Sequence, residues 1–460
     1  MPVGVVTSTS LKSSPAVLPA SPEARFFVAG VTERGPVGEA VRCRSLADFE
    51  AVFGGAVSYS NLHEHMRVFW AEGGYEAYVS RVVGPDPVNA TISLDTGKLV
   101  VTAKNPGAFA NGWTAAYTSA SKTLTIVTDT ATETYAGSDL ATLLTATEDS
   151  ATVDVSSSGT LPSSNVTATA LASGDDDRGD ITSTEAIDSL DVFVPGLGAG
   201  AVAIPGWTAD QLGDELIEWA AETKRVALLA TARTDLLATA QTTAEGLTDS
   251  EGNGGLFWPW LLTPSGATIS PESAVAGLRA RVIRNAGPWV APAGGNGVLA
   301  YISDTDQKAT RAEVDAAHDD SGVSVVTIVS GGPRLYGWRS LAGTNDLRYL
   351  HYRDTLNMIA YKVEAALEPY VYAPMTGALA QNAAGTCMGV LEPLVSGGAL
   401  FPMVDDDGNT IDPGYQVTVS TTTGEAGEGI LEPAIAVRIV AAAELILVPI
   451  TKVAVGATLA

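Results

Sequence analysis

The feature that most constrains the fold is an alternation of short apolar segments with capped helical segments. Strands are predicted at Phe26–Val31, Glu76–Val83, Asp191–Val194, Val226–Ala230, Leu256–Leu262, Val298–Ser303 and Val323–Val329. Helices are predicted from Ser45 to Gly54, Asn61 to Gly73, Thr208 to Lys224, Ser270 to Gly287, Gln307 to His318, Asn345 to Leu367 and Thr376 to Val395, with Asn345–Leu367 the longest. Such alternation implies a mostly parallel sheet buried between helices. The predicted fold class is therefore α/β (α+β) and multidomain.

The alternation is interrupted between residues 85 and 185, where Thr, Ser, Ala and Asp dominate. Short alternating runs there predict strands at Thr91–Leu94, Leu99–Ala103, Trp113–Thr118 and Thr123–Val127. The stretch 174–179 is expected to be a solvated linker. We therefore expect an N-terminal arm at 1–24, an α/β core at 25–84 and 186–400, an inserted β-rich domain at 85–185, and C-terminal strands and an arm at 401–460.

Charge and hydropathy exclude several classes of partner. The 460 residues contain 52 Asp and Glu against 26 Lys and Arg, a formal net charge of -26. A surface of that sign repels phosphate, so neither nucleic acid nor an anionic membrane is an expected partner. The apolar run Ile439–Ile450 is interrupted by Glu444 and Pro449, too short for a membrane-spanning helix. Neither a signal peptide nor a transmembrane segment is predicted.

Motifs that carry chemistry are weak here, and no catalytic, cofactor-binding or metal-binding residue is assigned. Gly196–Ala201 fits G-x-G-x-x-A, but Pro205 intervenes before the helix that starts at Thr208, which argues against a dinucleotide site. Asp405–Asn409 superficially resembles a calcium loop, but the spacing favours a solvated turn.

The histidines and cysteines also give no site. His63 and His65 lie two residues apart on a predicted helix, a spacing that cannot share a metal, and are expected to be exposed. His318 and His351 have no neighbouring ligands at a useful spacing. Cys43 and Cys387 are expected to be buried or inert thiols.

Both ends of the chain are rich in β-prone residues that have little local structure to pair with. At the N-terminus these are Val3, Val5 and Val6. At the C-terminus, strands are predicted at Tyr415–Ser420 and Ala434–Ile450, separated by a Gly-rich loop at Thr421–Gly429. The second of these contains Val437, Ile439, Leu445 and Leu447.

Unpaired β segments favour strand exchange between subunits, because an exposed sheet edge is a template for another chain. Heterologous contacts of that kind close into rings or continue as helical filaments. The residues alone therefore point to a polymer subunit without catalytic chemistry.

An ordered series of segments resembles contractile tail sheath proteins of bacteriophages and related injection systems. The segments are Phe26–Pro36, Ser45–Phe49, Phe53–Gly55, Phe69–Val82, Ala103–Gly112, Asp191–Gly196, Phe257–Leu261, Gly287–Gly294 and Tyr336–Leu341. Together they run through most of the chain outside 85–185. Ser330–Arg334 stands where relatives often carry a more basic loop, so no contact with an inner tube is assigned to it.

The resemblance implies a subunit of a virion tail that stacks in sixfold rings around an inner tail tube and shortens when a baseplate triggers it. It implies as partners other copies of the chain, the tube protein, and baseplate and terminator proteins, with assembly in the host cytoplasm and no cofactor. The terminal arms would add strands to a sheet in neighbouring subunits. Two alternatives stay open: a static shell or surface-layer subunit, and an α/β enzyme with a β-rich lid.

Overall fold

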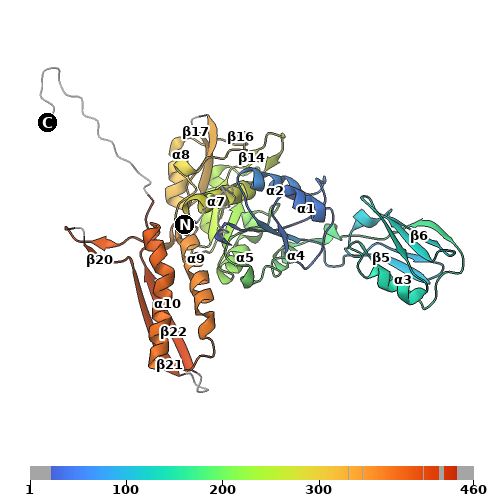
Figure 1. Ribbon diagram of the computed structural model, residues 1–460. Helices are drawn as coiled ribbons and strands as arrows, with labels where there is room; N and C mark the ends of the chain where they lie inside the picture. The colour runs from blue at the N-terminus through green and yellow to red at the C-terminus, as the bar shows by residue number, and fades with distance from the viewer. Residues whose placement is uncertain (1–21, 330, 344, 408, 424–428, 443–460) are drawn as a thin grey trace, which may run out of the picture. The chain divides into compact units, whose positions relative to one another are not determined.

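The computed structural model describes residues 22–329, 331–343, 345–407, 409–423 and 429–442 (Figure 1). The chain divides into two compact units. The first, here called the core unit, comprises the described residues within 22–288 and 292–361. The second, here called the C-terminal unit, comprises 289–291 and the described residues within 362–442. In the described residues, no helix is long and apolar enough to cross a membrane.

An eight-stranded sheet organises the core unit. Its order is β18 (Gly332–Tyr336), β17 (Ser324–Val329), β13 (Gly254–Trp258), β12 (Val226–Ala230), β11 (Ala201–Ala203), β1 (Phe26–Gly30), β3 (Ala77–Arg81) and β2 (Val41–Cys43). All pairs are parallel except β17–β18 and β2–β3 at the two edges. The expected mostly parallel sheet is confirmed, and its central strands are buried on both faces, as helices on both sides require.

Helices cover the two faces of this sheet. The helices are α1 (Leu46–Phe53), α2 (Leu62–Ala71), α4 (Ser183–Asp188), α5 (Ala209–Glu222), α6 (Leu237–Gly246), α7 (Glu272–Ala286) and α8 (Arg311–Ala316). A further helix, α9 (Leu350–Leu367), begins in the core unit and continues into the C-terminal unit at Lys362. Phe26 packs against Phe69 of α2 on one face, while Phe27 packs against Phe193 on the other. A Cβ at Gly277 would lie 2.5 Å from the Phe69 carbonyl oxygen, so only glycine lets α7 approach α2 this closely.

Most predicted helix starts are confirmed. Ser45 accepts a hydrogen bond from the Asp48 amide, and Thr208 and Gln211 form a capping box. Asn61 makes no side-chain cap; Ser60 accepts the Leu62 amide instead. The helix predicted from Asn345 begins only at Leu350, so it is shorter than α10 (Gly377–Ser396), which has 20 residues.

The segment between β3 and α4 forms two further antiparallel sheets. One is β4 (Thr91–Leu94), β5 (Leu99–Ala103) and β9 (Val153–Ser156); the other is β10 (Val166–Ala170), β6 (Thr114–Thr118), β7 (Thr123–Val127) and β8 (Thr132–Ala136), with α3 (Leu140–Thr147). They share a core around Trp113, Tyr117 and Leu143. The predicted strands at 91–94, 99–103 and 123–127 have the observed bounds.

The prediction of a strand at Asp191–Val194 is wrong. The chain turns there, and the next strand is β11. The fully buried Arg225 guanidinium donates to the carbonyls of Phe193, Val194 and Gly198. Arg225 thus provides the hydrogen-bond donors for these carbonyl groups. In a strand, the carbonyl groups would instead accept hydrogen bonds from a neighbouring strand.

The strand predicted at Val298–Ser303 is also wrong. The carboxylate of Glu72, which is 0% exposed at the end of α2, accepts the amides of Ala300, Tyr301 and Ile302 at 2.8, 2.7 and 3.2 Å. Arg281 donates to the same carboxylate at 3.3 Å. The amides that a strand would pair in a ladder are therefore bound by one side chain.

Two smaller differences concern local chain geometry. The strand predicted at Leu256–Leu262 is divided into β13 and β14 (Leu261–Leu262), which pairs with β15 (Thr268–Ile269) and β16 (Asp304–Thr305) in a separate sheet. The expected solvated linker at 174–179 is not solvated throughout, because Asp176 is 1% exposed between Arg81 and Arg178.

Replacing Glu72 with alanine should destabilise the core unit strongly. The substitution removes a fully buried carboxylate that accepts three amides and pairs with Arg281, so we expect the free energy of unfolding to fall by roughly 3 to 5 kcal/mol. Guanidinium unfolding followed by circular dichroism measures the change. Glu218→Ala, on the exposed face of α5, is the control and should change stability by less than about 0.5 kcal/mol. Equal effects of the two substitutions would contradict this role for Glu72.

Candidate assembly interface

A two-stranded antiparallel ribbon dominates the C-terminal unit (Figure 1). β21 (Tyr415–Thr423) pairs with β22 (Gly429–Val437) over nine residues, from Tyr415 opposite Val437 to Thr423 opposite Gly429. The predicted first strand is thus confirmed but extends to Thr423. The second begins at Gly429 rather than Ala434, and its regular pairing ends at Val437.

The ribbon has one half-buried apolar face and one exposed face. Tyr415, Val417 and Val419 alternate with exposed Gln416, Thr418 and Ser420 along β21. β21 packs against α10, which buries Leu379, Ala383, Cys387, Leu391 and Leu394 along one stripe. Three- and four-residue spacing of these side chains defines the packed face of the helix. The other face of the ribbon remains open in the C-terminal unit.

The two edges of the ribbon differ in their capacity to accept another strand. The Arg438 amide donates to the Gly414 carbonyl, so the main-chain groups of even-numbered residues point between the strands. The N–H and C=O groups of the odd-numbered residues then point outward. On β21 every one of these outward-facing residues has an N–H. On β22 the outward-facing residues include Pro433, which has no N–H. Within the described residues, no strand pairs with either outer edge.

The predicted interface residues are only partly described. Val437 ends β22, and Ile439 forms a bridge with Leu400 beyond it. Arg438 between them bonds the Asp412 carboxylate through both terminal nitrogens. Val3, Val5, Val6, Leu445 and Leu447 lie outside the described residues.

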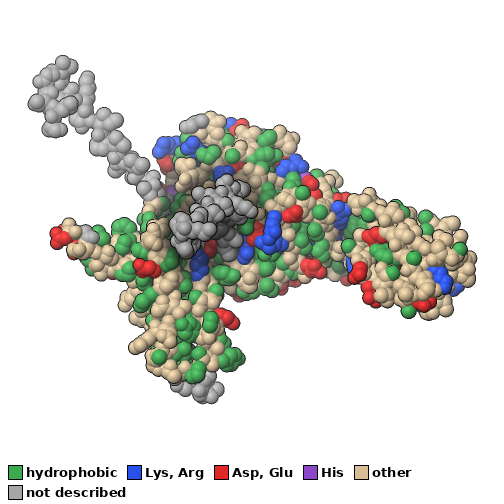
Figure 2. Space-filling view, viewed as in Figure 1, with side chains coloured by type: hydrophobic (Ala, Val, Ile, Leu, Met, Phe, Trp, Pro, Cys, Tyr) green, Lys and Arg blue, Asp and Glu red, His purple; other side chains and the backbone are tan. Residues whose placement is uncertain are grey.

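Large exposed hydrophobic side chains are concentrated in the C-terminal unit. A short hairpin of β19 (Met403–Val404) and β20 (Thr410–Asp412) adds further apolar side chains beside acidic ones at its tip (Figure 2). The exposed set is Val371, Tyr372, Met375, Met388, Phe401, Met403, Val404, Ile411 and Ile430. Apolar side chains gathered in this way are typical of surfaces that contact another protein.

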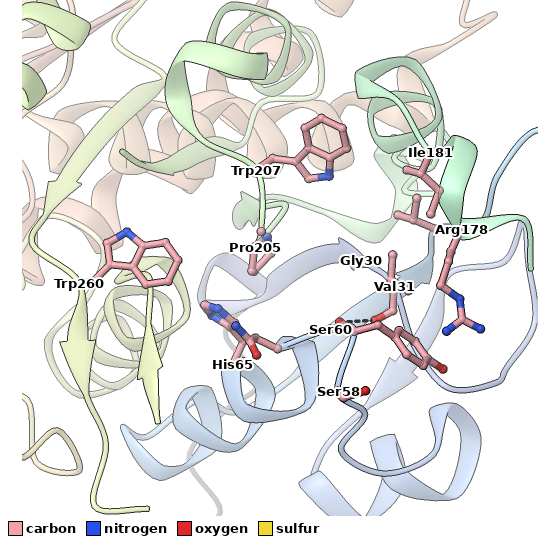
Figure 3. Close-up of a pocket in the computed structure, with 14 residues that line it drawn as sticks. Gly30, Val31, Ser58, Ser60, His65, Arg178, Ile181, Pro205, Trp207 and Trp260 are labelled. Atoms are coloured by element: carbon pink, nitrogen blue, oxygen red, sulfur yellow. Dashed lines mark hydrogen bonds between the residues drawn. The ribbon is translucent and has the colours of Figure 1, made fainter. Parts of the chain in front are cut away.

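The core unit contains a cleft that is relevant to the enzyme alternative (Figure 3). It has a volume of about 420 Å³ and is lined in part by His65, Arg178, Trp207 and Trp260. Among its described lining residues none is Asp or Glu, so it offers no carboxylate for acid–base chemistry. In the described part of the chain, no group of three or more His, Cys, Asp or Glu could hold a metal ion.

The expectation that His63 and His65 are exposed is wrong. His63 bonds Glu50 at 2.8 Å and is 6% exposed, and His65 Nδ1 lies 3.1 Å from Ser273 Oγ with 2% exposure. Both face neighbouring helices because α2 is packed between α1 and α7. Sequence spacing gave no signal for this, since α7 lies more than 200 residues further along the chain.

The glycine-rich segment, the acidic turn and the two cysteines form no binding site in the described residues. Gly196 lies in a short 3-10 turn and Ala201 begins β11, so the glycine-rich segment precedes a strand rather than opening a helix. Asp405 accepts the Asp407 and Asn409 amides in an exposed turn. Both cysteines are free and buried, and burial raises the pKa of the Cys43 thiol to about 12.

Solved structures share this fold over nearly the whole chain. A sheath tail protein from Listeria innocua matches with a TM-score of 0.64 and 15% identity, covering 90% of this chain and 95% of that one. The helical sheath of the anti-feeding prophage in its contracted state matches at 0.57 and 17% identity, over 97% and 98%. The contracted sheath complex of the extracellular contractile injection system PVC matches at 0.54 and 17% identity, over 98% of both chains.

No protein-family model and no curated protein matches the chain. The structural likeness nevertheless shows that the chain has the sheath-protein fold, an α/β core with additional β-rich parts.

His65 should make stability depend on pH. Burial lowers its pKa from 6.5 to about 3 in the folded protein, so between these values the unfolded chain binds a proton that the folded chain does not. Stability therefore falls as pH falls, and from pH 7 to pH 5 His65 contributes a loss of about 2 kcal/mol. His65→Gln should shrink the difference in unfolding free energy between these pH values by that amount.

His351 offers an independent check, since burial lowers its pKa to about 4. His351→Gln should likewise reduce the difference in unfolding free energy between pH 7 and pH 5. If both variants keep the full pH difference of the unsubstituted protein, the two histidines do not remain neutral in the folded state.

Proposed function

We propose that this protein is the structural subunit of a contractile sheath in a phage tail or a related injection system. The likeness of fold to sheath proteins along nearly the whole chain carries the proposal. In this function, copies stack as sixfold rings around an inner tube, and contraction on a baseplate signal drives the tube through the envelope of a target cell. Partners would be other copies, the tube protein, and baseplate and terminator proteins, in a virion tail or similar particle.

The open edges of the β21–β22 ribbon supply a mechanism for joining subunits. An isolated two-stranded ribbon is marginal in water, and added strands satisfy its outer main-chain groups. We assign the N-terminal arm around Val3–Val6 and the C-terminal segment containing Leu445 and Leu447 as the donated strands. The uninterrupted β21 edge is the better acceptor, because Pro433 removes one donor from the other edge.

Donated strands also account for how a sheath could shorten without falling apart. Subunits can rotate as rigid bodies while their arms remain paired with neighbours. A small free-energy difference between the extended and the contracted state of each subunit is then multiplied over many copies. Contraction would therefore require no nucleotide or cofactor. The β-rich segment 85–185 would form the outer domain, and 401–460 the joining domain.

The non-catalytic alternative is a static shell or surface-layer subunit, which would form one lattice of fixed length. The enzyme alternative is disfavoured by a cleft that lacks carboxylates in its described lining. A sheath subunit is therefore distinguished from a shell subunit by whether its lattice forms in two different lengths.

Electron microscopy of purified protein and native particles tests the function, with arm deletion as the perturbation. We expect hollow helical tubes in a long and a short form. Removing residues 1–20 should leave a folded protein by circular dichroism that forms no tubes, because the donated strand is gone. Unchanged tube formation would refute strand donation, whereas dispersed monomers of the full chain under all assembly conditions would refute the sheath.

A single substitution on β21 tests which edge accepts the strand. Thr421 is exposed, and its N–H points outward, so Thr421→Pro removes one outward donor without breaking a β21–β22 hydrogen bond. We expect at least a tenfold loss of sedimentable polymer with unchanged monomer folding. Thr421→Ala keeps the N–H and should polymerise normally. Equal polymerisation of the two variants would exclude the β21 edge.

A further inference from the structure

The cleft in the core unit lies where the order of the parallel strands changes direction. β3 and β11 lie on opposite sides of β1. After β1 the chain adds β3 on one side, and it later adds β11 on the other side. Gly30 and Val31 at the carboxyl end of β1, and Pro205–Trp207 just after β11, line the cleft. Parallel sheets bind ligands at this position, because connections diverge there and leave a crevice.

Aromatic side chains form much of the wall (Figure 3). Trp207 and Trp260 lie to either side of Pro205, and Tyr59 also lines the cleft. Trp260 Nε1 donates to the Thr231 carbonyl at 2.9 Å, which fixes its indole. These three rings stack on no other ring of the described residues. Because Arg178 covers one face of Tyr59, the indoles of Trp207 and Trp260 are the rings of the wall that suit a planar apolar group.

His65 directs a polar atom toward the same space. Its Nδ1 lies 3.1 Å from Ser273 Oγ, and its imidazole points from α2 toward Pro205 in Figure 3. The hydrogen bond to Ser273 uses Nδ1, which leaves Nε2 of this 2% exposed residue for a bound molecule. Burial lowers the pKa of His65 to about 3, so the ring is neutral and offers one hydrogen bond rather than a charge.

Arg178 gives the cleft a positive charge in a strongly acidic protein. Its guanidinium lies 3.7 Å from the centre of the Tyr59 ring, and its Nε donates to Asp176 at 2.8 Å. Asp176 is also 3.7 Å from Arg81, so two guanidinium groups share one buried carboxylate. Asp175 also acts on Arg178, and Glu33 acts on the Tyr59 ring. Arg178 is the charged side chain that lines the cleft, and it is 34% exposed, so its guanidinium can be reached from the cleft.

We propose that this cleft binds a small planar aromatic molecule that carries a single negative charge. The ring would lie against Trp207 and Trp260, and the anionic group would face Arg178 and the start of α2. A volume of about 420 Å³ accommodates a ligand with one or two fused rings.

Three probes separate the contributions of ring and charge. Isothermal titration of the full chain with 2-naphthoate, neutral 2-naphthamide and acetate compares ring plus charge, ring alone and charge alone. We expect saturable binding of 2-naphthoate with at least tenfold lower Kd than 2-naphthamide, and no binding of acetate. Absence of saturable 2-naphthoate binding, or equal Kd values for the two naphthyl probes, would overturn the proposal.

Variants then locate the site. Arg178→Gln should abolish the preference for 2-naphthoate over 2-naphthamide, and Trp207→Ala should weaken both at least tenfold. Trp207→Leu keeps apolar volume and replaces the alanine variant if that one fails to fold. Arg311→Gln, whose side chain is 93% exposed on α8, is the charge-matched control and should bind like the unsubstituted protein. Equal affinities in Arg178→Gln, Trp207→Leu and the control would place binding elsewhere and overturn the proposal.

Discussion

Buried charged side chains that satisfy main-chain groups are the interaction on which the core unit depends. Glu72 accepts three successive amides, Asp249 accepts those of Gly252, Asn253 and Gly254, and Arg225 donates to three carbonyls. Arg225 joins the segment before β11 to the start of β12, and Glu72 joins the end of α2 to the segment before β16. Asp249 binds the turn that leads into β13. Hydrogen bonds to charged groups contribute about 1.5 to 3 kcal/mol each, and leaving such main-chain groups unpaired costs a similar amount. Loops beside the sheet are thus held in one conformation without extending the sheet.

The same contacts explain where sequence reasoning succeeded and failed. Apolar periodicity and caps such as Ser45 and Thr208 are local signals, and they predicted the parallel sheet and most helices. The two wrong strands, near Phe193 and Tyr301, are segments whose main chain is bound by residues far along the chain. Local pattern carries no information about such a partner. The cleft was missed for the same reason, since its lining comes from segments well separated in sequence.

The C-terminal unit differs from the core unit in how much of its apolar surface is buried. Its ribbon buries only one face, and much of its apolar surface, including Phe401 and Ile411, stays exposed in the described chain. The strand pattern at Tyr415–Ser420 was readable from sequence because alternation is local, whereas the end of β22 at Val437 depends on the bridge of Ile439 to Leu400. An element with exposed apolar surface is stabilised by a partner that binds it, so in the proposed sheath the folding of this unit would be linked to assembly.

Charge adds a constraint on how copies associate. Arg81, Arg225, Arg279 and Arg339 are each at most 2% exposed, so these cations do little to offset acidic groups at the surface. The net charge of -26 then opposes association of identical copies, and salt screens this repulsion only beyond a Debye length of about 8 Å. In the proposed sheath, the free energy of polymerisation must therefore come from strand pairing and burial of apolar side chains. The described part of the C-terminal unit has both unpaired strand edges and exposed apolar side chains available for such contacts.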